Sequence, residues 1–244
     1  MFLNEFQEGI VDQAVQFNNE LNPVLFDGNR LNATVRYKLL LIAQNFARFI
    51  DIPKLNLKDI TISGSNAAYT YTKHSDLDLH LIVDIPSAAE FHLKPLFDAK
   101  KNQYNYNHDI KIKGIDVELY VQSSKEKHIS AGIYSVLDDH WIKEPGLVRA
   151  NINDNDVEQK VENYLNKIKL ALKTKDYDKA NSVKSEISKL RKAGLETTGE
   201  FGVENIAFKV LRTQGWIDRL RQHIYDLEDQ NLSLKERKRS VMKY

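Results

Sequence analysis

The stretch Lys58-Asp59-Ile60-Thr61-Ile62-Ser63-Gly64-Ser65 is followed, after ten further residues, by Asp76-Leu77-Asp78-Leu79-His80-Leu81. Its first six residues include β-branched side chains and end at Gly64, so they predict a short strand that runs into a turn. A glycine at this turn lets the backbone approach a ligand closely. Ser65 adds a hydroxyl, and residues 66–69 can begin a short helix whose N-terminus favours anions. The stretch therefore predicts a turn that binds phosphate.

A strand with carboxylates on one face follows the turn. Polar and apolar residues alternate from Asp76 to Leu81, which is the period of a half-buried strand. Asp76, Asp78 and His80 are therefore expected to share one face. Two carboxylates about 7 Å apart, from a rise of about 3.3 Å per residue, repel each other unless a cation lies between them. Hard oxygen ligands with a triphosphate as co-ligand suit Mg²⁺ or Mn²⁺.

A second acidic strand is predicted at Ile115-Asp116-Val117-Glu118-Leu119-Tyr120-Val121, with Asp116, Glu118 and Tyr120 on its outer face. If it pairs beside the first acidic strand, one of its acids completes a cluster of three carboxylates. Glu118 is the preferred third ligand, because Asp116 lies next to the Gly114 turn, where local hydrogen bonds can use it. Asp116 remains the alternative.

These residues resemble a known superfamily. Gly64-Ser65, the Asp76 and Asp78 pair and a later acidic strand look like the nucleotidyltransferases related to DNA polymerase beta. Further segments resemble the uncharacterised predicted nucleotidyltransferases of large tailed phages. These segments are Leu21-Asn22-Pro23, Thr61-Ile62-Ser63-Gly64-Ser65, Ser75-Asp76-Leu77-Asp78-Leu79-His80, Val117-Glu118-Leu119-Tyr120-Val121-Gln122, Gly199-Glu200-Phe201 and Glu204-Asn205. This closer resemblance covers about residues 21–220.

The resemblance implies a small mixed sheet with helices, two divalent metal ions and a nucleoside triphosphate (NTP). By the same resemblance Asp76 and Asp78 hold both metal ions, and Glu118 binds the ion that activates the acceptor hydroxyl. Such a pair of ions lowers the pKa of the hydroxyl and neutralises charge on the leaving pyrophosphate. Many relatives carry Arg and Gly soon after Gly-Ser, whereas this chain has Asn66-Ala67-Ala68. A cation that contacts the triphosphate must therefore come from another part of the chain, or this contact is missing.

Three cationic residues are candidates for that role. Lys209 and Arg212 fall on one helical face with Asn205, opposite the apolar seam. Lys73 lies just before the first acidic strand. We predict Lys73, Lys209 and Arg212 as nucleotide-binding residues beside Gly64 and Ser65. A solvated stripe of charge is the alternative interpretation of the helical pair.

The predicted fold class is α/β (α+β), with a small mixed sheet and flanking helices followed by a C-terminal helical bundle. Residues 1–150 are predicted to form the nucleotidyltransferase catalytic domain, with N-terminal helices at Phe2 to Leu21 and Thr34 to Ile50. The hydrophobic period changes to that of helices after about residue 150. Residues 151–244 are therefore predicted to form a separate helical domain.

A further helix and a loop are predicted inside the catalytic domain. The helix runs from Ser87, as its cap, to Lys101. The following stretch, residues 102–107, is rich in Asn and Tyr and is expected to form a loop at the mouth of the site. Its Tyr104 and Tyr106 can stack on a base or pack the loop itself.

Composition sets outer bounds on the class of protein. A chain of 244 residues that is 42% hydrophobic and 28% charged is ordinary for a globular protein. Zero cysteines exclude disulfides and fit a reducing cytoplasm, which is the host cytoplasm if a phage encodes the chain. The N-terminus has no basic region before an apolar run, and no apolar run approaches 18 residues. Neither secretion nor a membrane span is predicted.

Charge is distributed unevenly. Residues 1–155 carry 16 Lys and Arg against 20 Asp and Glu, a net of −4, and residues 156–244 carry 19 against 14, a net of +5. The basic half is suited to meet phosphates, so an RNA 3′ end is the favoured acceptor. A small molecule, a protein side chain or the nucleotide itself remains open as acceptor. A module that senses nucleotides or neutralises a toxin without turnover is the alternative function.

Overall fold

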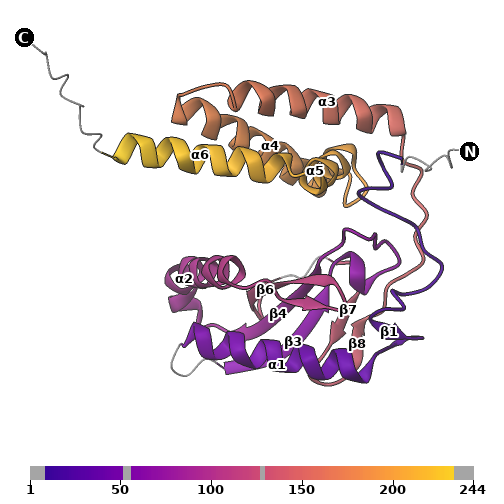
Figure 1. The fold of residues 1–244 in the computed structure, drawn as a ribbon. Coiled ribbons are helices and arrows are strands. Elements are labelled where there is room, and N and C mark those ends of the chain that lie inside the picture. Colours follow the sequence, from indigo (N-terminus) through magenta and orange to yellow (C-terminus); the bar gives the residue numbers. More distant parts are fainter. Residues whose placement is uncertain (1–8, 52–55, 127–129, 234–244) are drawn as a thin grey trace, which may run out of the picture. The chain divides into compact units, whose positions relative to one another are not determined.

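The computed structural model describes residues 9–51, 56–126 and 130–233. The chain divides into two compact units (Figure 1). The first consists of residues 15–149, and the second of residues 150–244 together with 1–14.

The first unit is built on a sheet of six strands in the order β5-β6-β4-β3-β7-β8. The strands are β3 (Asn56–Ser63), β4 (Leu77–Asp84), β5 (Lys111–Ile112), β6 (Ile115–Ser123), β7 (Ile133–Ser135) and β8 (His140–Lys143). β4 and β6 run parallel, and the other neighbours are antiparallel. The parallel pair requires a crossover, which α2 (Ser87–Asn107) provides. The predicted mixed sheet is confirmed.

One face of this sheet is apolar and covered by helices. Leu77, Leu79 and Leu81 of β4 are fully buried, as their period-2 alternation predicts. They share one hydrophobic core with α1 (Ala33–Ile50) and α2. α1 begins after Asn32, whose side chain accepts from the backbone N–H groups of the first turn. Ser63 of β3, Asp78 and His80 of β4, and Glu118 and Tyr120 of β6 consequently lie on the opposite face of the sheet.

A two-stranded ribbon, β1 (Phe26–Asp27) with β2 (Arg30–Leu31), joins the rest of the unit through aromatic rings. The ring of Phe26 stacks on Trp141 of β8 with 5.5 Å between ring centroids, and Tyr134 of β7 lies edge-on to both. The ribbon thereby packs against the β7–β8 hairpin, which pairs with β3.

The predicted helix at Phe2 to Leu21 is wrong over its described part, residues 9–21, which form turns and irregular backbone. The backbone N–H of Asn18 donates to the carbonyl of Tyr69, and its side-chain amide donates to the carbonyls of Tyr69 and Tyr71. Long-range hydrogen bonds therefore take the place of a helical ladder at this point. Residues 9–14 group with the second unit, where the Gln214 amide donates to Gln13.

The second unit is the predicted helical bundle, which is confirmed. Its helices are α3 (Asp154–Ala171), α4 (Tyr177–Thr197), α5 (Val203–Thr213) and α6 (Trp216–Leu232). The side chains of Asn153 and Asp176 cap the first two of these helices. Gly215 adopts a positive φ of 75°, which ends α5 and starts α6. No helix among the described residues is long and apolar enough to cross a bilayer.

Candidate functional site

The turn after β3 brings a backbone segment directly against a carboxylate. Gly64 has φ 79° and ψ −165°, a conformation open essentially to glycine alone. A Cβ atom placed on Gly64 would lie 2.3 Å from Oδ2 of Asp78. The backbone N–H of Gly64 donates to the hydroxyl of Ser130 (3.2 Å). Gly64 is therefore required by its backbone angles and by the closeness of the Asp78 carboxylate.

The short helix predicted after the turn is a single 3₁₀ turn, Ser65–Ala67, with Asn66 completely buried. The Asn66 amide donates to the backbone carbonyls of Ser75 and Asp76 (both 2.9 Å). Its carbonyl oxygen accepts from the amide of Asn22 (2.7 Å). Buried polar side chains with every partner in place define one local geometry. Asn66 thus fixes the start of the acidic strand to the glycine turn.

A pair of hydroxyls strengthens the same link. The hydroxyl of Ser65 donates to the hydroxyl of Ser75 (2.8 Å), which in turn accepts from the backbone N–H of Thr72 (2.9 Å). Sequence reasoning assigned Asn66 only to a helix start and gave Asn22 no role. Asn22 and Ser75 lie within the segments that resemble the phage proteins, whereas Asn66 lies just after one of them, and only the fold shows that the three residues meet.

Asp78 and Glu118 occupy directly paired positions of the parallel strands β4 and β6. Ser63 of β3 is paired with Asp78 on its other side, so three polar residues form one row across the sheet. Both carboxylate residues are partly buried. Asp76 lies immediately before β4, and its backbone is held by Asn66. The structure thereby places Asp76, Asp78, Glu118 and Gly64 in one region of the unit.

Glu118 has a close partner on its own strand. The hydroxyl of Tyr120 donates to Oε2 of Glu118. The ring of Tyr120 stacks on His80, its partner in the parallel register, with 4.9 Å between centroids and 17° between planes. Nε2 of His80 lies 3.1 Å from the hydroxyl of Ser63. A polar chain of contacts therefore crosses β3, β4 and β6 beside the acidic pair.

Asp116, the alternative third carboxylate, has a different environment. Its side chain is 55% exposed and forms an ion pair with Lys111 of the neighbouring strand β5. The hydrogen bonds that Lys111 donates to Asp116 and, second, to Asp109 raise the pKa of Lys111. Asp116 is thus engaged at the β5–β6 hairpin, whereas Glu118 is paired with Asp78.

The donor chemistry of the acidic residues suits a hard divalent cation, since carboxylate oxygens and phosphates are the ligands that Mg²⁺ prefers. Among the described residues, however, no three His, Asp or Glu side chains gather closely enough to hold a metal ion by themselves. A Mg²⁺ site needs only one or two carboxylates when substrate phosphates and water complete the octahedron. Asp78 and Glu118 provide two carboxylate side chains at paired positions of β4 and β6.

The predicted cations lie in different parts of the chain. Lys73 is exposed in the turn between Thr72 and Ser75. Lys209 and Arg212 belong to α5 of the second unit. The predicted common solvent face of α5 is wrong for Asn205, which is 2% exposed because α3 and α4 both pack against this helix.

The buried amide of Asn205 has partners within the bundle. It donates to the carbonyl of Glu200 (2.7 Å) and accepts from Nε of Arg191 (3.1 Å). The guanidinium of Arg191 also lies over the ring of Phe208, 4.2 Å from its centroid. Asn205 therefore serves the packing of α4 against α5.

The predicted loop at residues 102–107 is wrong, because α2 begins at Ser87 with Pro86 as its cap residue and continues to Asn107. The side chain of Asn105 donates to the carbonyl of Leu119 (3.1 Å) and accepts from its N–H (3.2 Å). These bonds pair the open edge of β6 and hold the end of the helix in place. Tyr104 is buried against Phe46 and cannot stack on a base, whereas Tyr106 is 92% exposed.

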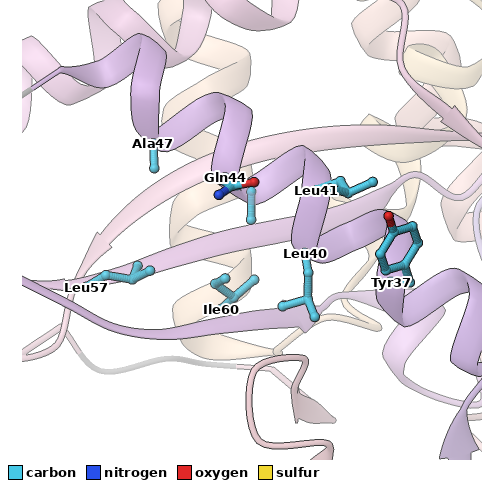
Figure 2. A pocket seen from close by; sticks show the side chains of 8 residues that line it. Tyr37, Leu40, Leu41, Gln44, Ala47, Leu57 and Ile60 are labelled. Atoms are coloured by element: carbon cyan, nitrogen blue, oxygen red, sulfur yellow. The ribbon is translucent and has the colours of Figure 1, made fainter.

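An apolar groove of about 390 Å³ lies between α1 and β3 (Figure 2). Tyr37, Leu40 and Gln44 of α1 line one wall, and Leu57 and Ile60 of β3 line the other. Ile60 belongs to the apolar core face of β3. The groove is therefore on the helix-covered side of the sheet and is separate from the acidic pair.

No family model and no curated protein matches the sequence. Among solved structures, the chain is similar to a STING-associated CdnE c-di-GMP synthase from Capnocytophaga granulosa. The two sequences are 11% identical, the match covers 83% of this chain and 84% of that chain, and the TM-score is 0.25. A TM-score this low does not establish a common fold.

Proposed function

We propose that the chain is a metal-dependent nucleotidyltransferase that moves a nucleoside monophosphate from an NTP to an acceptor. The observation that carries this proposal is the contact of Asp78 with the Gly64 turn combined with its direct pairing to Glu118. A turn with close backbone access and two adjacent carboxylates is the arrangement that can hold a triphosphate through a divalent cation. The motif resemblance of residues 64–118 agrees with this chemistry.

Each residue has a proposed role. The triphosphate lies along Gly64 and Ser65, and Asp76, Asp78 and Glu118 are the metal ligands. Asn66 holds the backbone of Asp76 at the turn, which orients the carboxylates before substrate binds. When bound, Mg²⁺ or Mn²⁺ supplies neutralisation of phosphate charge and a lowered pKa for the acceptor hydroxyl.

The reaction is an in-line displacement at the α-phosphorus. A bond forms between the acceptor oxygen and the α-phosphorus, and the bond from the α-phosphorus to the bridging oxygen of the β-phosphate breaks. Pyrophosphate leaves with that electron pair, and the proton of the acceptor hydroxyl is released to solvent. We favour an RNA 3′ end as acceptor because residues 156–244 carry a net charge of +5.

The direct test is transfer of label. The purified protein is incubated with each α-labelled NTP, Mg²⁺ or Mn²⁺, and either bacterial RNA or a small-metabolite extract. Label in RNA supports the full proposal, label in a small species keeps the enzyme and changes the acceptor, and no transfer to any acceptor contradicts it. Nucleotide binding without transfer would favour a module that senses the nucleotide.

Variants then assign the transfer to this site. Asp76→Asn combined with Asp78→Asn is expected to lower the rate at least about 100-fold, because several kcal/mol of charge stabilisation is lost. The matched control is Asp98→Asn, an exposed acid in the same unit, which should retain activity. Glu118→Gln and Asp116→Asn decide the third ligand: loss in the first and not in the second supports Glu118. A fully active Asp76→Asn, Asp78→Asn protein with native circular dichroism would reject the mechanism.

A further inference from the structure

Tyr120 makes a contact with Glu118 that has no part in the motif. Its hydroxyl donates to Oε2 of Glu118. The two residues lie two positions apart on the same face of β6, where their Cα atoms are about 7 Å apart, so both side chains must lean toward each other. One oxygen of the carboxylate is engaged in this way, and a carboxylate has acceptor capacity left for a second ligand.

The ring of Tyr120 is itself held from several sides. His80 stacks on it from the neighbouring strand β4, and His80 is linked in turn to Ser63 of β3. The ammonium group of Lys101 of α2 lies 4.8 Å from the ring centroid, within the range of a cation–π interaction. The Tyr120 hydroxyl consequently has a defined position before any ligand arrives.

A fixed hydroxyl has two consequences for Glu118. A free glutamate side chain loses rotamer freedom when it binds a cation, and a hydrogen bond that is already formed reduces that loss. Like charges at paired positions of neighbouring strands repel each other, and Asp78 faces Glu118 in this way. The Tyr120 hydroxyl holds one oxygen of the Glu118 carboxylate in a fixed direction beside Asp78.

We infer that Tyr120 is a positioning residue: it holds the Glu118 carboxylate in the orientation in which a divalent cation binds between β4 and β6. This inference rests on the proposed function, because it takes Glu118 as a metal ligand. Hydrogen-bond partners of metal-binding carboxylates typically contribute 10–100-fold to metal affinity. Tyr120 has no contact with the reacting atoms in this assignment and acts only through Glu118.

The test is a double-mutant cycle on metal affinity. The electron paramagnetic resonance signal of free Mn²⁺ measures this affinity, so the readout does not depend on turnover. Tyr120→Phe keeps the ring and removes the hydroxyl, and it should weaken Mn²⁺ binding about tenfold. Glu118→Gln should weaken it as well. In the Glu118→Gln protein, adding Tyr120→Phe should change the affinity by less than about twofold, because the effect passes through Glu118. Tyr106→Phe, at an exposed tyrosine of the same unit, is the matched control.

The outcomes separate this inference from the proposed function. The positioning role is overturned if Tyr120→Phe lowers the Mn²⁺ affinity equally in the wild-type and Glu118→Gln backgrounds. It is also overturned if Tyr120→Phe leaves the affinity unchanged or raises it. In each of these cases, Mn²⁺ binding by the wild-type protein still supports the metal site. A wild-type protein that binds no Mn²⁺ overturns the positioning role, and the transfer assay then decides the proposed function, in which substrate phosphates complete the coordination of the metal. Should Tyr120→Phe fail to fold, Lys101→Met releases the ring from α2 instead. The inference is supported if Lys101→Met weakens Mn²⁺ binding in the wild-type background but not in the Glu118→Gln background. Unchanged Mn²⁺ binding in Lys101→Met overturns it.

Discussion

Gly64 and Asp78 stand so close that a single methyl group on the glycine would overlap the carboxylate. The Cβ position lies 2.3 Å from Asp78 Oδ2 and 3.3 Å from Cγ. Asp78 would have to move, and Asp78 is paired with Glu118. Glycine is therefore required at position 64 for two reasons: its backbone angles, and the position of the carboxylate of Asp78, the residue that pairs with Glu118.

Gly64→Ala should abolish nucleotide transfer, because alanine displaces the Asp78 carboxylate. It should also lower the free energy of unfolding by about 1–2 kcal/mol through its positive φ. Gly114→Ala is the matched control: Gly114 has φ 87°, but no atom lies within 4 Å of its Cβ position. Both variants should lose stability in urea titrations, and only the first should lose transfer. Equal transfer rates in the two proteins would show that the Gly64 contact does not matter for activity.

Asn66→Ala removes three hydrogen bonds from a fully buried position. The carbonyls of Ser75 and Asp76 and the amide of Asn22 then lose a buried partner, so we expect the free energy of unfolding to fall by about 3 kcal/mol. Transfer should fall at least tenfold at a temperature where the variant is folded, since a misplaced ligand of this kind can cost about 100-fold.

The control for Asn66→Ala is Asn45→Ala, because Asn45 is exposed and its amide donates to the Leu41 carbonyl of its own helix. That change should alter stability by less than about 0.5 kcal/mol. Thermal melts and transfer rates of both variants check the prediction. Native stability in Asn66→Ala would mean that the link between turn and strand is dispensable.

The sequence was sufficient for features whose signal is local. The alternation in Asp76 to Leu81 predicts β4 because a buried face leaves a period of two, and helical periodicity predicts the bundle in the same way. Pairing of Asp78 with Glu118 was expected only conditionally, since it depends on the parallel register of β4 and β6.

Features that depend on distant contacts were missed. Asn66 meets Asn22 across 44 positions, and no local pattern encodes that bond. The Asn- and Tyr-rich end of α2 has low helix propensity, yet it is helical because Asn105 is held by the backbone of Leu119. The first residues were predicted as a helix from their amphipathic pattern, whereas Asn18 bonds to the backbone near Tyr69. Tertiary hydrogen bonds outweigh local preference at each of these positions.

Substitution of Lys209 and Arg212 tests whether these cations bind the triphosphate. If these residues bind the triphosphate, Lys209→Ala combined with Arg212→Ala should raise KM for the NTP at least about tenfold, since hydrogen bonds to charged groups contribute about 1.5–3 kcal/mol each. The value of kcat should change less. Arg221→Ala is the control, because Arg221 of α6 is half-exposed and paired with Asp218. An unchanged KM in the double variant, together with a raised KM in Lys73→Ala, would show that Lys73, just before β4, binds the triphosphate instead.

The hydroxyl of Tyr164 in α3 is buried without a hydrogen-bond partner among the described residues. Burial, with Glu204 and Glu186 nearby, raises the pKa of Tyr164 to about 12. Removing an unpaired buried hydroxyl relieves a desolvation cost, so Tyr164→Phe should stabilise the bundle by about 1 kcal/mol at neutral pH. Urea midpoints of the two proteins measure this difference, provided that their m values agree.

The same tyrosine predicts a pH dependence with a definite sign. In the unfolded chain Tyr164 ionises near pH 10, as a free tyrosine does, whereas in the folded protein it keeps its proton to about pH 12. Between these values the folded state binds more protons, so the stability of wild type relative to Tyr164→Phe should be constant below about pH 9 and fall above about pH 10. Parallel stability curves for wild type and Tyr164→Phe up to about pH 11 would show that the Tyr164 hydroxyl ionises normally in the folded bundle. A Tyr164→Phe protein that is less stable than wild type at neutral pH would show that the Tyr164 hydroxyl has a hydrogen-bond partner.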